Sequence, residues 1–168
     1  MDANHYARVW QGKRNKVVGD FFEEIIEATC KHYQANKIAA IKKTPEPMRP
    51  IKNLGQGKFV AYFEKKAQPD FKGTLKGGRT IIFDAKHTDT DRIQRKVISD
   101  EQEKELDVHE ELGALCLVLL SFGFEQFYKV PWQTFKAMKA IYGRQYVKPE
   151  DLAEYQIPYI GGILKFLD

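Results

Sequence analysis

The chain has 168 residues, of which 43% are hydrophobic and 12% aromatic, and its net charge is +4 at neutral pH. This composition excludes a disordered protein and predicts one domain, residues 1–168, with a substantial core. The longest apolar run, residues 114–120, is too short to span a membrane, and no signal-peptide pattern opens the chain, so we expect a cytoplasmic protein without a membrane partner.

Residues 1–18 are basic and show no clear helical or strand period. We interpret them as an N-terminal arm. The arm could be a frayed terminus, or Lys13 and Arg14 could contact a phosphate backbone.

A helix is predicted from Asp20, because apolar residues recur at helical spacing from there to Tyr33. Asp20 is the expected N-cap, with Glu23 at the third position of a capping box. Glu23 falls at the border of the apolar face, whereas Glu24 points into solvent. Glu23 could therefore face a site at the sheet edge, or it could serve only as the capping partner.

A long excursion follows a short predicted strand at residues 38–41. Three prolines between residues 45 and 50 hold the chain extended, a glycine-containing turn follows at 53–57, and residues 58–63 run back. An excursion of about twenty residues between two strands is too long for an ordinary connection. We therefore predict a projecting stalk at about residues 45–66.

The stalk and its base are basic and aromatic. Seven basic and two acidic residues lie between positions 42 and 66. Such a surface suits phosphate contacts combined with stacking on unpaired bases, although a solvated charged hairpin is the plainer alternative. The residues expected to contact nucleic acid here are Lys42, Lys43, Arg49, Lys52, Lys58, Phe59, Tyr62, Phe63, Lys65, Lys66 and Lys72.

Two carboxylates and a lysine are expected to meet after the stalk. Asp84 and Lys86 end an apolar strand at residues 79–85 and, being two residues apart, project from one face. Asp70 opens an extended segment that turns back at residues 76–79, so a hairpin can bring it beside Asp84. The plainer alternative is an Asp–Lys pair on a solvated face of the sheet.

This trio indicates a particular chemistry. Mg²⁺ binds one or two carboxylates together with substrate phosphate. A lysine beside the cation can orient or deprotonate water, or neutralise charge developing on the phosphate. The pattern favours phosphodiester hydrolysis.

The rest of the chain completes a mixed α/β sheet with helices on its faces. A capping box from Ser99 to Gln102 opens a helix that ends near Leu112, and strands follow at residues 114–122 and 126–130. The last segment, 152–167, is expected to pack on the body or to form part of a subunit interface. A helix at 132–142 is expected to cover the sheet with Trp132, Phe135, Met138, Lys139 and Tyr142.

Several stretches together resemble one family. They are Gly19-Asp20-Phe21-Phe22-Glu23-Glu24, Tyr33-Gln34-Ala35-Asn36, Ile41-Lys42-Lys43-Thr44-Pro45-Glu46-Pro47, Asp70-Phe71-Lys72-Gly73 and Ile82-Phe83-Asp84-Ala85-Lys86-His87-Thr88. In order and spacing they resemble the RecU family of Holliday junction resolvases, within the PD-(D/E)xK nuclease superfamily. A phage-encoded member would fit the compact length.

The resemblance implies a restriction-endonuclease-like fold, a homodimer, Mg²⁺ with Mn²⁺ able to substitute, and paired symmetric nicks in four-way DNA junctions. It implies that Asp70, Asp84 and Glu23 bind metal, that Lys86 is the catalytic lysine and that Gln102 belongs to the catalytic group. This chain has Asp84 where members of the family usually have Glu, and the usual Arg-Gly before the first helix is not reproduced cleanly.

Two alternatives stay open. The first is a nuclease of the same fold that acts on other branched or duplex DNA. The second is a non-catalytic DNA-binding or architectural protein, which the joint presence of Asp70, Asp84 and Lys86 disfavours. No nucleotide cofactor is expected in any of these cases.

Overall fold

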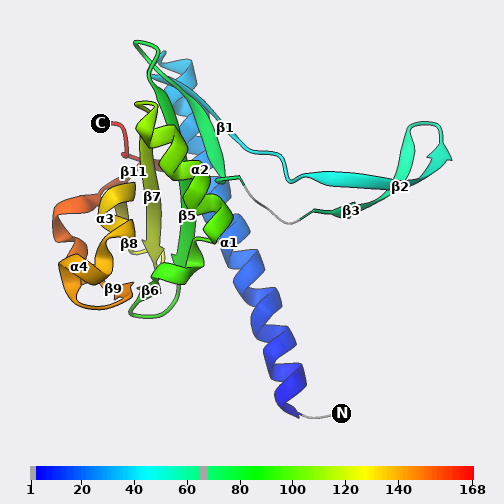
Figure 1. The fold of residues 1–168 in the computed structure, drawn as a ribbon, viewed down its shortest axis with the longest axis horizontal. Coiled ribbons are helices and arrows are strands. Elements are labelled where there is room, and N and C mark those ends of the chain that lie inside the picture. The colour runs from blue at the N-terminus through cyan, green and yellow to red at the C-terminus, as the bar shows by residue number, and fades with distance from the viewer. Residues whose placement is uncertain (1–2, 65–67) are drawn as a thin grey trace.

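The structure is a computed structural model that describes residues 3–64 and 68–168, with side chains from residue 17 onward. A mixed sheet is flanked by helices, and a long hairpin projects from it (Figure 1). The elements are α1 (Ala3–Ala35), β1 (Ala39–Lys43), β2 (Met48–Gly55), β3 (Lys58–Phe63), β4 (Phe71–Leu75), β5 (Thr80–Thr88), β6 (Ile93–Gln94), η1 (Arg95–Val97), α2 (Asp100–Glu111), β7 (Leu115–Phe122), β8 (Gln126–Pro131), α3 (Trp132–Lys136), α4 (Met138–Tyr142), β9 (Tyr146–Val147), η2 (Pro149–Tyr155), β10 (Gln156–Ile157), β11 (Tyr159–Ile160) and β12 (Ile163–Leu164).

The main sheet has the strand order β1-β4-β5-β7-β8-β10. The β5 and β7 strands pair in parallel, from Ile81↔Leu115 to Thr88↔Phe122, and the other neighbours are antiparallel. A parallel pair needs a crossover connection, and α2 lies within this one. Both central strands are covered on both faces, which explains their nearly continuous apolar sequences. The predicted mixed sheet with flanking helices is confirmed.

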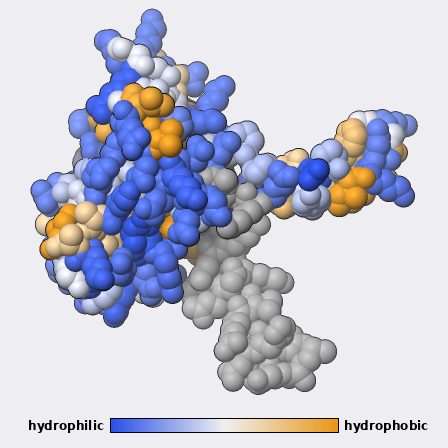
Figure 2. Space-filling model, viewed as in Figure 1, coloured by the Kyte–Doolittle hydropathy of each residue, from blue (hydrophilic) through white to orange (hydrophobic). Residues whose placement is uncertain are grey.

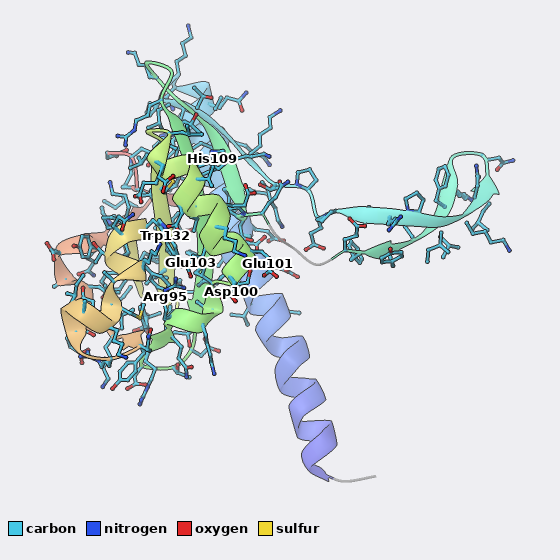
Figure 3. All side chains as sticks on the ribbon, in the orientation of Figure 1. Arg95, Asp100, Glu101, Glu103, His109 and Trp132 are labelled. Atoms are coloured by element: carbon cyan, nitrogen blue, oxygen red, sulfur yellow. The ribbon has the colours of Figure 1, made fainter. Side chains whose placement is uncertain are left out.

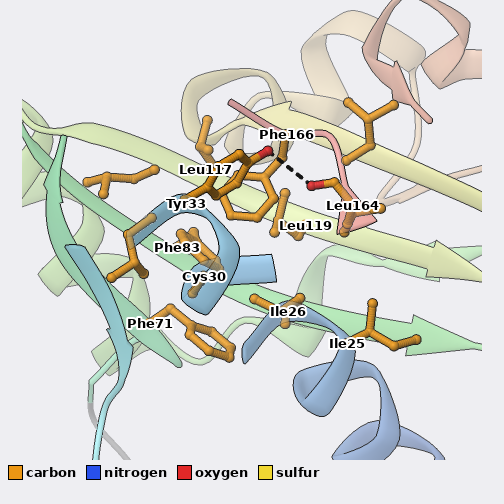
Figure 4. Packing of buried hydrophobic residues seen from close by; sticks show 14 of the residues in the cluster. Ile25, Ile26, Cys30, Tyr33, Phe71, Phe83, Leu117, Leu119, Leu164 and Phe166 are labelled. Atoms are coloured by element: carbon orange, nitrogen blue, oxygen red, sulfur yellow. Dashed lines mark hydrogen bonds between the residues drawn. The ribbon is translucent and has the colours of Figure 1, made fainter. Parts of the chain in front are cut away.

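Two hydrophobic cores lie on opposite faces of the sheet. Ile81, Phe83 and Ala85 of β5 belong to the core under α1, whereas Ile82 belongs to the core under α2. Because side chains alternate along a strand, Asp84 projects to the α2 face. The α1 core also holds the buried helical residues predicted from the sequence, which are Phe22, Ile25, Ile26, Cys30 and Tyr33. Figure 4 shows the last four of them in the core.

The N-terminal arm was the wrong expectation. Residues from Ala3 onward form the first half of α1, so Asp20 lies inside a helix and cannot be its N-cap. This half extends away from the sheet (Figure 1). Once a helix is nucleated on the core, each further residue adds a backbone hydrogen bond, so it can continue where no apolar periodicity marks it.

The helix predicted at 132–142 is broken. Ala137 ends α3 with φ −85° and ψ 11°, and α4 starts at the next residue. Trp132, Phe135 and Met138 are buried as predicted, but Lys139 is exposed, and its expected place against the sheet was wrong. The shorter helices let the apolar residues follow the twisted sheet while the lysine stays in water.

The C-terminal segment packs on the body, which confirms one of the two expectations for it. Its β10 strand pairs with β8 at the sheet edge, and Phe166 is fully buried against Tyr33 and Phe83. A role in a subunit interface stays a prediction. No helix in the described ranges is long and apolar enough to cross a membrane.

The predicted stalk is an antiparallel hairpin of β2 and β3, registered from Met48↔Phe63 to Gly55↔Lys58. Every residue of both strands is exposed. Figure 2 shows hydrophobic patches between hydrophilic ones along the projection. The exposed apolar residues are Met48, Ile51, Leu54, Phe59, Val60, Tyr62 and Phe63.

Candidate active site

The site is built on the β4–β5 hairpin. Phe71 pairs with Phe83, and Asp70 therefore lies next to Asp84 at the end of the paired segment. Close packing of β1 on β4 requires Gly73, since a Cβ there would lie 2.1 Å from the carbonyl oxygen of Ala40. The sequence thus fixes the position of the hairpin against its outer neighbour.

The structure brings the two acids and the lysine together. The N–H of Ala85 donates to Oδ2 of Asp70 at 2.9 Å. Nζ of Lys86 donates to Oδ1 of Asp84 at 2.8 Å and lies 3.4 Å from Oδ2 of Asp70. The geometry therefore gives the arrangement that the Asp70 and Asp84-x-Lys86 spacing predicts.

Burial makes this cluster electrostatically strained. Burial raises the pKa of Asp84 well above its ordinary value, and the adjacent Asp70 carboxyl raises it further, while Lys86 opposes both. Burial by itself would lower the pKa of Lys86, but the charges of Asp84 and Asp70 outweigh it, and the pKa is raised. Within the part of the chain that the structure describes, both buried carboxylates contact the ammonium of Lys86.

The residues fit a divalent cation, because adjacent buried carboxylates are favourable ligands for one. Oδ2 of Asp84 is buried and has no hydrogen-bond partner within residues 3–64 and 68–168. Hard cations bind carboxylate oxygens of this kind. Asp70 and Asp84 would hold the ion, with the remaining positions left for water and phosphate. Across the described residues, no group of three or more His, Cys, Asp and Glu side chains is gathered for a metal.

Glu23 is placed differently from the expectation that it joins Asp70 and Asp84. Its Oε2 accepts from Nζ of Lys43 at 2.7 Å, and this pair, together with α1, lies against the other face of the sheet from Asp84. The Glu23 hydrogen bond also raises the pKa of Lys43. The assignment of Glu23 as a metal ligand stays a prediction.

Gln102 has a structural task in α2. Its Oε1 accepts from the N–H of Ser99 at 3.1 Å, and its own N–H donates to Ser99 Oγ at 3.2 Å, so the predicted capping box is confirmed. Gln102 is also buried. A catalytic role for it stays a prediction.

The residues expected to contact DNA occupy several places. Arg49, Lys52, Lys58, Phe59, Tyr62 and Phe63 lie on the exposed stalk, and Lys42 and Lys72 face each other on β1 and β4. Lys13 and Arg14 lie on α1, where the structure describes the backbone alone. Lys65 and Lys66 lie outside the described residues.

Two residues near the site were not singled out from the sequence. Thr44 follows β1 and is buried beside Asp70, and His109 lies in the last turn of α2. Figure 3 shows His109 at the opposite end of α2 from Asp100 and Glu101. The pairing of β1 with β4 places Thr44 beside Asp70, and the packing of α2 against β5 and β7 brings His109 near Thr44 and Lys72.

Comparison with known proteins agrees with the resemblance noted from the sequence. The family described as RecU, Recombination protein U, matches residues 17–167. A Holliday junction resolvase RecU of Bacillus pumilus is 29% identical over 81% of this chain and 70% of its own length. The RecU of Streptococcus mutans is 34% identical over 62% of this chain and 55% of its own length.

A solved structure is also similar in part. It is Hjc of Archaeoglobus fulgidus, described as a Holliday junction resolvase from an archaeal hyperthermophile. The TM-score is 0.44 at 15% identity, over 69% of this chain and 78% of that one.

Proposed function

Because the chain belongs to the RecU family, we propose that it is a metal-dependent, structure-selective endonuclease that resolves four-way DNA junctions by paired symmetric nicks. The observation that carries this proposal is the convergence of Asp70, Asp84 and Lys86 at the end of one hairpin. The relatives' name, Holliday junction resolvase, supports the choice of substrate. We place the activity in the cytoplasm.

Mg²⁺ is the proposed cofactor, with Mn²⁺ able to substitute. When bound, the cation would polarise the phosphate and favour deprotonation of the attacking water. Asp70 and Asp84 would hold it, and the unpartnered Oδ2 of Asp84 is the oxygen best placed to gain from it. The side chain of Asp84 is shorter than the usual Glu of the family by one methylene, which sets its carboxylate closer to β5.

The protein's own groups prepare the site for an anion. Lys86 holds a positive charge against both acids, where it can offset the negative charge that develops on a phosphate under attack. The N–H of Ala85 keeps the Asp70 carboxylate in one orientation. Burial of Asp84 excludes water from behind the carboxylate and strengthens each of these interactions.

Junction selectivity is assigned to the stalk and to a homodimer. Two nicks placed symmetrically about a branch point need two equivalent sites related by a two-fold axis. The exposed stalk is long and narrow and carries both cations and aromatic rings, a combination that suits the open centre of a branched junction. Its apolar residues are too many to be left in water without a partner.

One assay separates this proposal from its alternatives. Purified protein is incubated with end-labelled four-way junction and with linear duplex of the same sequence, with and without Mg²⁺. We expect paired nicks in opposing strands of the junction that require the metal. Equal cutting of duplex and junction would favour another nuclease specificity, and junction binding without any nick would favour an architectural protein.

A further inference from the structure

A threonine that the proposed chemistry does not use lies in line with the two acids. The N–H of Thr44 donates to the carbonyl of Asp70 at 2.8 Å, one residue beyond the Lys43↔Phe71 pair. Residues directly opposite each other in an antiparallel pair project to the same face. Thr44, Asp70 and Asp84 therefore form one row across β1, β4 and β5, on the α2 face of the sheet.

The hydroxyl of Thr44 is buried and has no partner among the residues that the structure describes. The residue is 4% exposed, and its Oγ1 makes no hydrogen bond to any residue that the structure describes. An unmade hydrogen bond in the interior is costly, and such groups are rare unless a ligand or ordered water completes them. The position of this hydroxyl beside Asp70 suggests that its partner arrives with the substrate.

A small cavity lies against this hydroxyl. It has a volume of about 60 Å³ and is bounded by Thr44 and Lys72 from the sheet and by His109 and Glu105 from α2. Such a volume is more than one water needs and suits a small oxyanion or a few waters. Ile82, two residues before Asp84 on the same strand face, forms part of its wall.

The charges around the cavity favour an anion. Lys42 and Lys72 are registered directly opposite each other, and no carboxylate from the described part of the chain lies in ion-pair contact with either. Like charges in that position are destabilising by themselves. Glu105 is the acid that lines the cavity, and Nε2 of His109 lies 3.7 Å from it. Lys72 lines the cavity, and an anion bound there would relieve its repulsion with Lys42 on the neighbouring strand.

The cavity is also at a useful distance from the acids. Lys42 and Lys72 lie two residues along their strands from Thr44 and Asp70, which is about 7 Å in an extended chain. Neighbouring phosphates of one nucleic-acid strand are separated by a similar length. A strand whose scissile phosphate reaches Asp70 and Asp84 would therefore bring the next phosphate to this cavity.

We propose that the cavity is a phosphate subsite, which holds the backbone phosphate adjacent to the one that is cut. The Thr44 hydroxyl and the Lys72 ammonium donate to it, and His109 closes it from α2. This inference rests on the proposed nuclease function. It adds a positioning residue, Thr44, whose role is to register the strand against the acids.

The test uses variants that keep the shape of the chain. Thr44→Val replaces the hydroxyl by a methyl group of nearly the same size, and Lys72→Gln removes the charge of an exposed side chain. Thr74→Val and Lys76→Gln are the matched controls, because both residues are exposed and neither lines the cavity. The Tm of Thr44→Val should not fall, since no hydrogen bond of the folded chain is removed.

Steady-state cleavage of a four-way junction should distinguish the two cavity variants from the two control variants. Thr44→Val and Lys72→Gln should each lose roughly tenfold or more in kcat/KM, which is the usual worth of a hydrogen bond to a charged group. We expect the loss mainly in KM, and the controls should match wild type. Wild-type kcat/KM in both cavity variants would overturn the subsite.

A substrate carrying one neutral methylphosphonate in place of a phosphate identifies the partner. A series of substrates carries the methylphosphonate at successive positions of the cut strand, and kcat/KM of the wild-type protein should fall when it replaces one phosphate adjacent to the nick. At that position kcat/KM of the Thr44→Val protein should fall little further, because the two changes remove the same interaction. An equal further loss in both proteins would contradict the assignment.

Failure of the subsite and failure of the nuclease function can be told apart. If the wild-type protein cuts no branched DNA, the proposed function is wrong. Anion binding in the cavity is then tested by titration with inorganic phosphate, followed through the NMR signals of the His109 ring. A shift in the wild-type protein that Thr44→Val abolishes would support an anion site, and no shift would overturn it.

Discussion

The N–H of Ala85 donates to the carboxylate of Asp70 at 2.9 Å, so the strand that carries one acid also holds the other in place. The Asp70 carboxylate is therefore held by the backbone of β5, and the pairing of β4 with β5 sets its position beside Asp84.

The acids should be needed for cutting and not for binding. Asp70→Asn and Asp84→Asn each keep the size of the side chain while removing the charge that would bind a cation, so cleavage should fall by on the order of 10³-fold. Junction affinity measured without metal should stay within a few-fold of wild type or improve. Glu24→Gln, a change in a solvent-exposed acid of α1, is the control. Cutting at the wild-type rate by either variant would show that the site is misassigned.

Lys86 should matter for both stability and catalysis. Its removal takes away the ammonium that contacts two adjacent buried carboxylates, so Lys86→Ala should lower the free energy of unfolding by on the order of 3 kcal/mol at neutral pH. Urea unfolding measures this loss, which added Mg²⁺ should partly restore. Lys86→Arg should keep much of the stability but not the activity, because a guanidinium is broader and planar. An active arginine variant would mean that charge alone is sufficient.

The stalk should be dispensable for folding and necessary for junction preference. Replacing residues 51–60 by an Asn-Gly turn joins the registered pair Pro50↔Ala61 in a short hairpin. All the removed residues are exposed, so the Tm should hold. Cleavage measured at fixed salt with competitor duplex should then lose its preference for the junction.

A variant that removes charge alone separates the contribution of the stalk's cations from that of its aromatic rings. The double variant Lys52→Gln, Lys58→Gln should lower the salt dependence of binding by roughly one unit of slope for each phosphate that is no longer neutralised. It should keep the junction preference if the aromatic rings carry it. If the shortened protein still prefers junctions, recognition would have to lie in the spacing of two sites across a dimer.

A homodimer should be present at micromolar concentration. Symmetric nicking requires two equivalent sites, and analytical ultracentrifugation gives the mass directly. With a supercoiled cruciform as substrate, the two nicks should occur within the lifetime of one complex. A monomer that remained fully active would contradict the symmetric mechanism.

Tyr33 should limit stability at alkaline pH. Its hydroxyl donates to Leu164 O at 3.2 Å and accepts from the N–H of Leu167 at 3.1 Å, and burial raises its pKa from 10.0 to about 12. An unfolded tyrosine therefore loses its proton first, and the free energy of unfolding should fall as the pH rises from 10 to 12.

The substitution Tyr33→Phe tests this assignment. It should cost about 1–2 kcal/mol at pH 8 and flatten the decline above pH 10. Tyr62→Phe, on the exposed stalk, is the control and should leave the curve unchanged. A decline of unchanged steepness in the Tyr33 variant would assign it to another group.

Much of the fold could be predicted because local signals and tertiary packing agree. The apolar runs of β5 and β7, the capping box at Ser99 and the prolines before the stalk each specify one structure. The start of α1 could not be predicted, since a helix that projects from the body carries no apolar periodicity. The break at Ala137 could not be predicted either, because it depends on how α3 and α4 pack on the twisted sheet, which no local sequence pattern encodes.

The site was predictable to the extent that it is local. Asp84 and Lys86 share a strand, and one hairpin brings Asp70 to them. Thr44 and His109 are contributed by β1 and α2, and their relation to the acids depends on which strand pairs with β4 and how the crossover helix lies. The sequence predicts Glu23 at the border of the apolar face of its helix, but its ion pair with Lys43 depends on β1 as well.

The contacts between α1 and the C-terminal segment have a consequence for synthesis of the chain. Thr29 Oγ1 accepts from the N–H of Leu164, and Tyr33 and Phe83 close around Phe166, so residues about 135 positions apart complete one core. A ribosome releases residues 164–166 long after it has released α1. The α1 face behind the acids therefore stays open on the nascent chain, and this core closes only after residues 164–166 have left the ribosome.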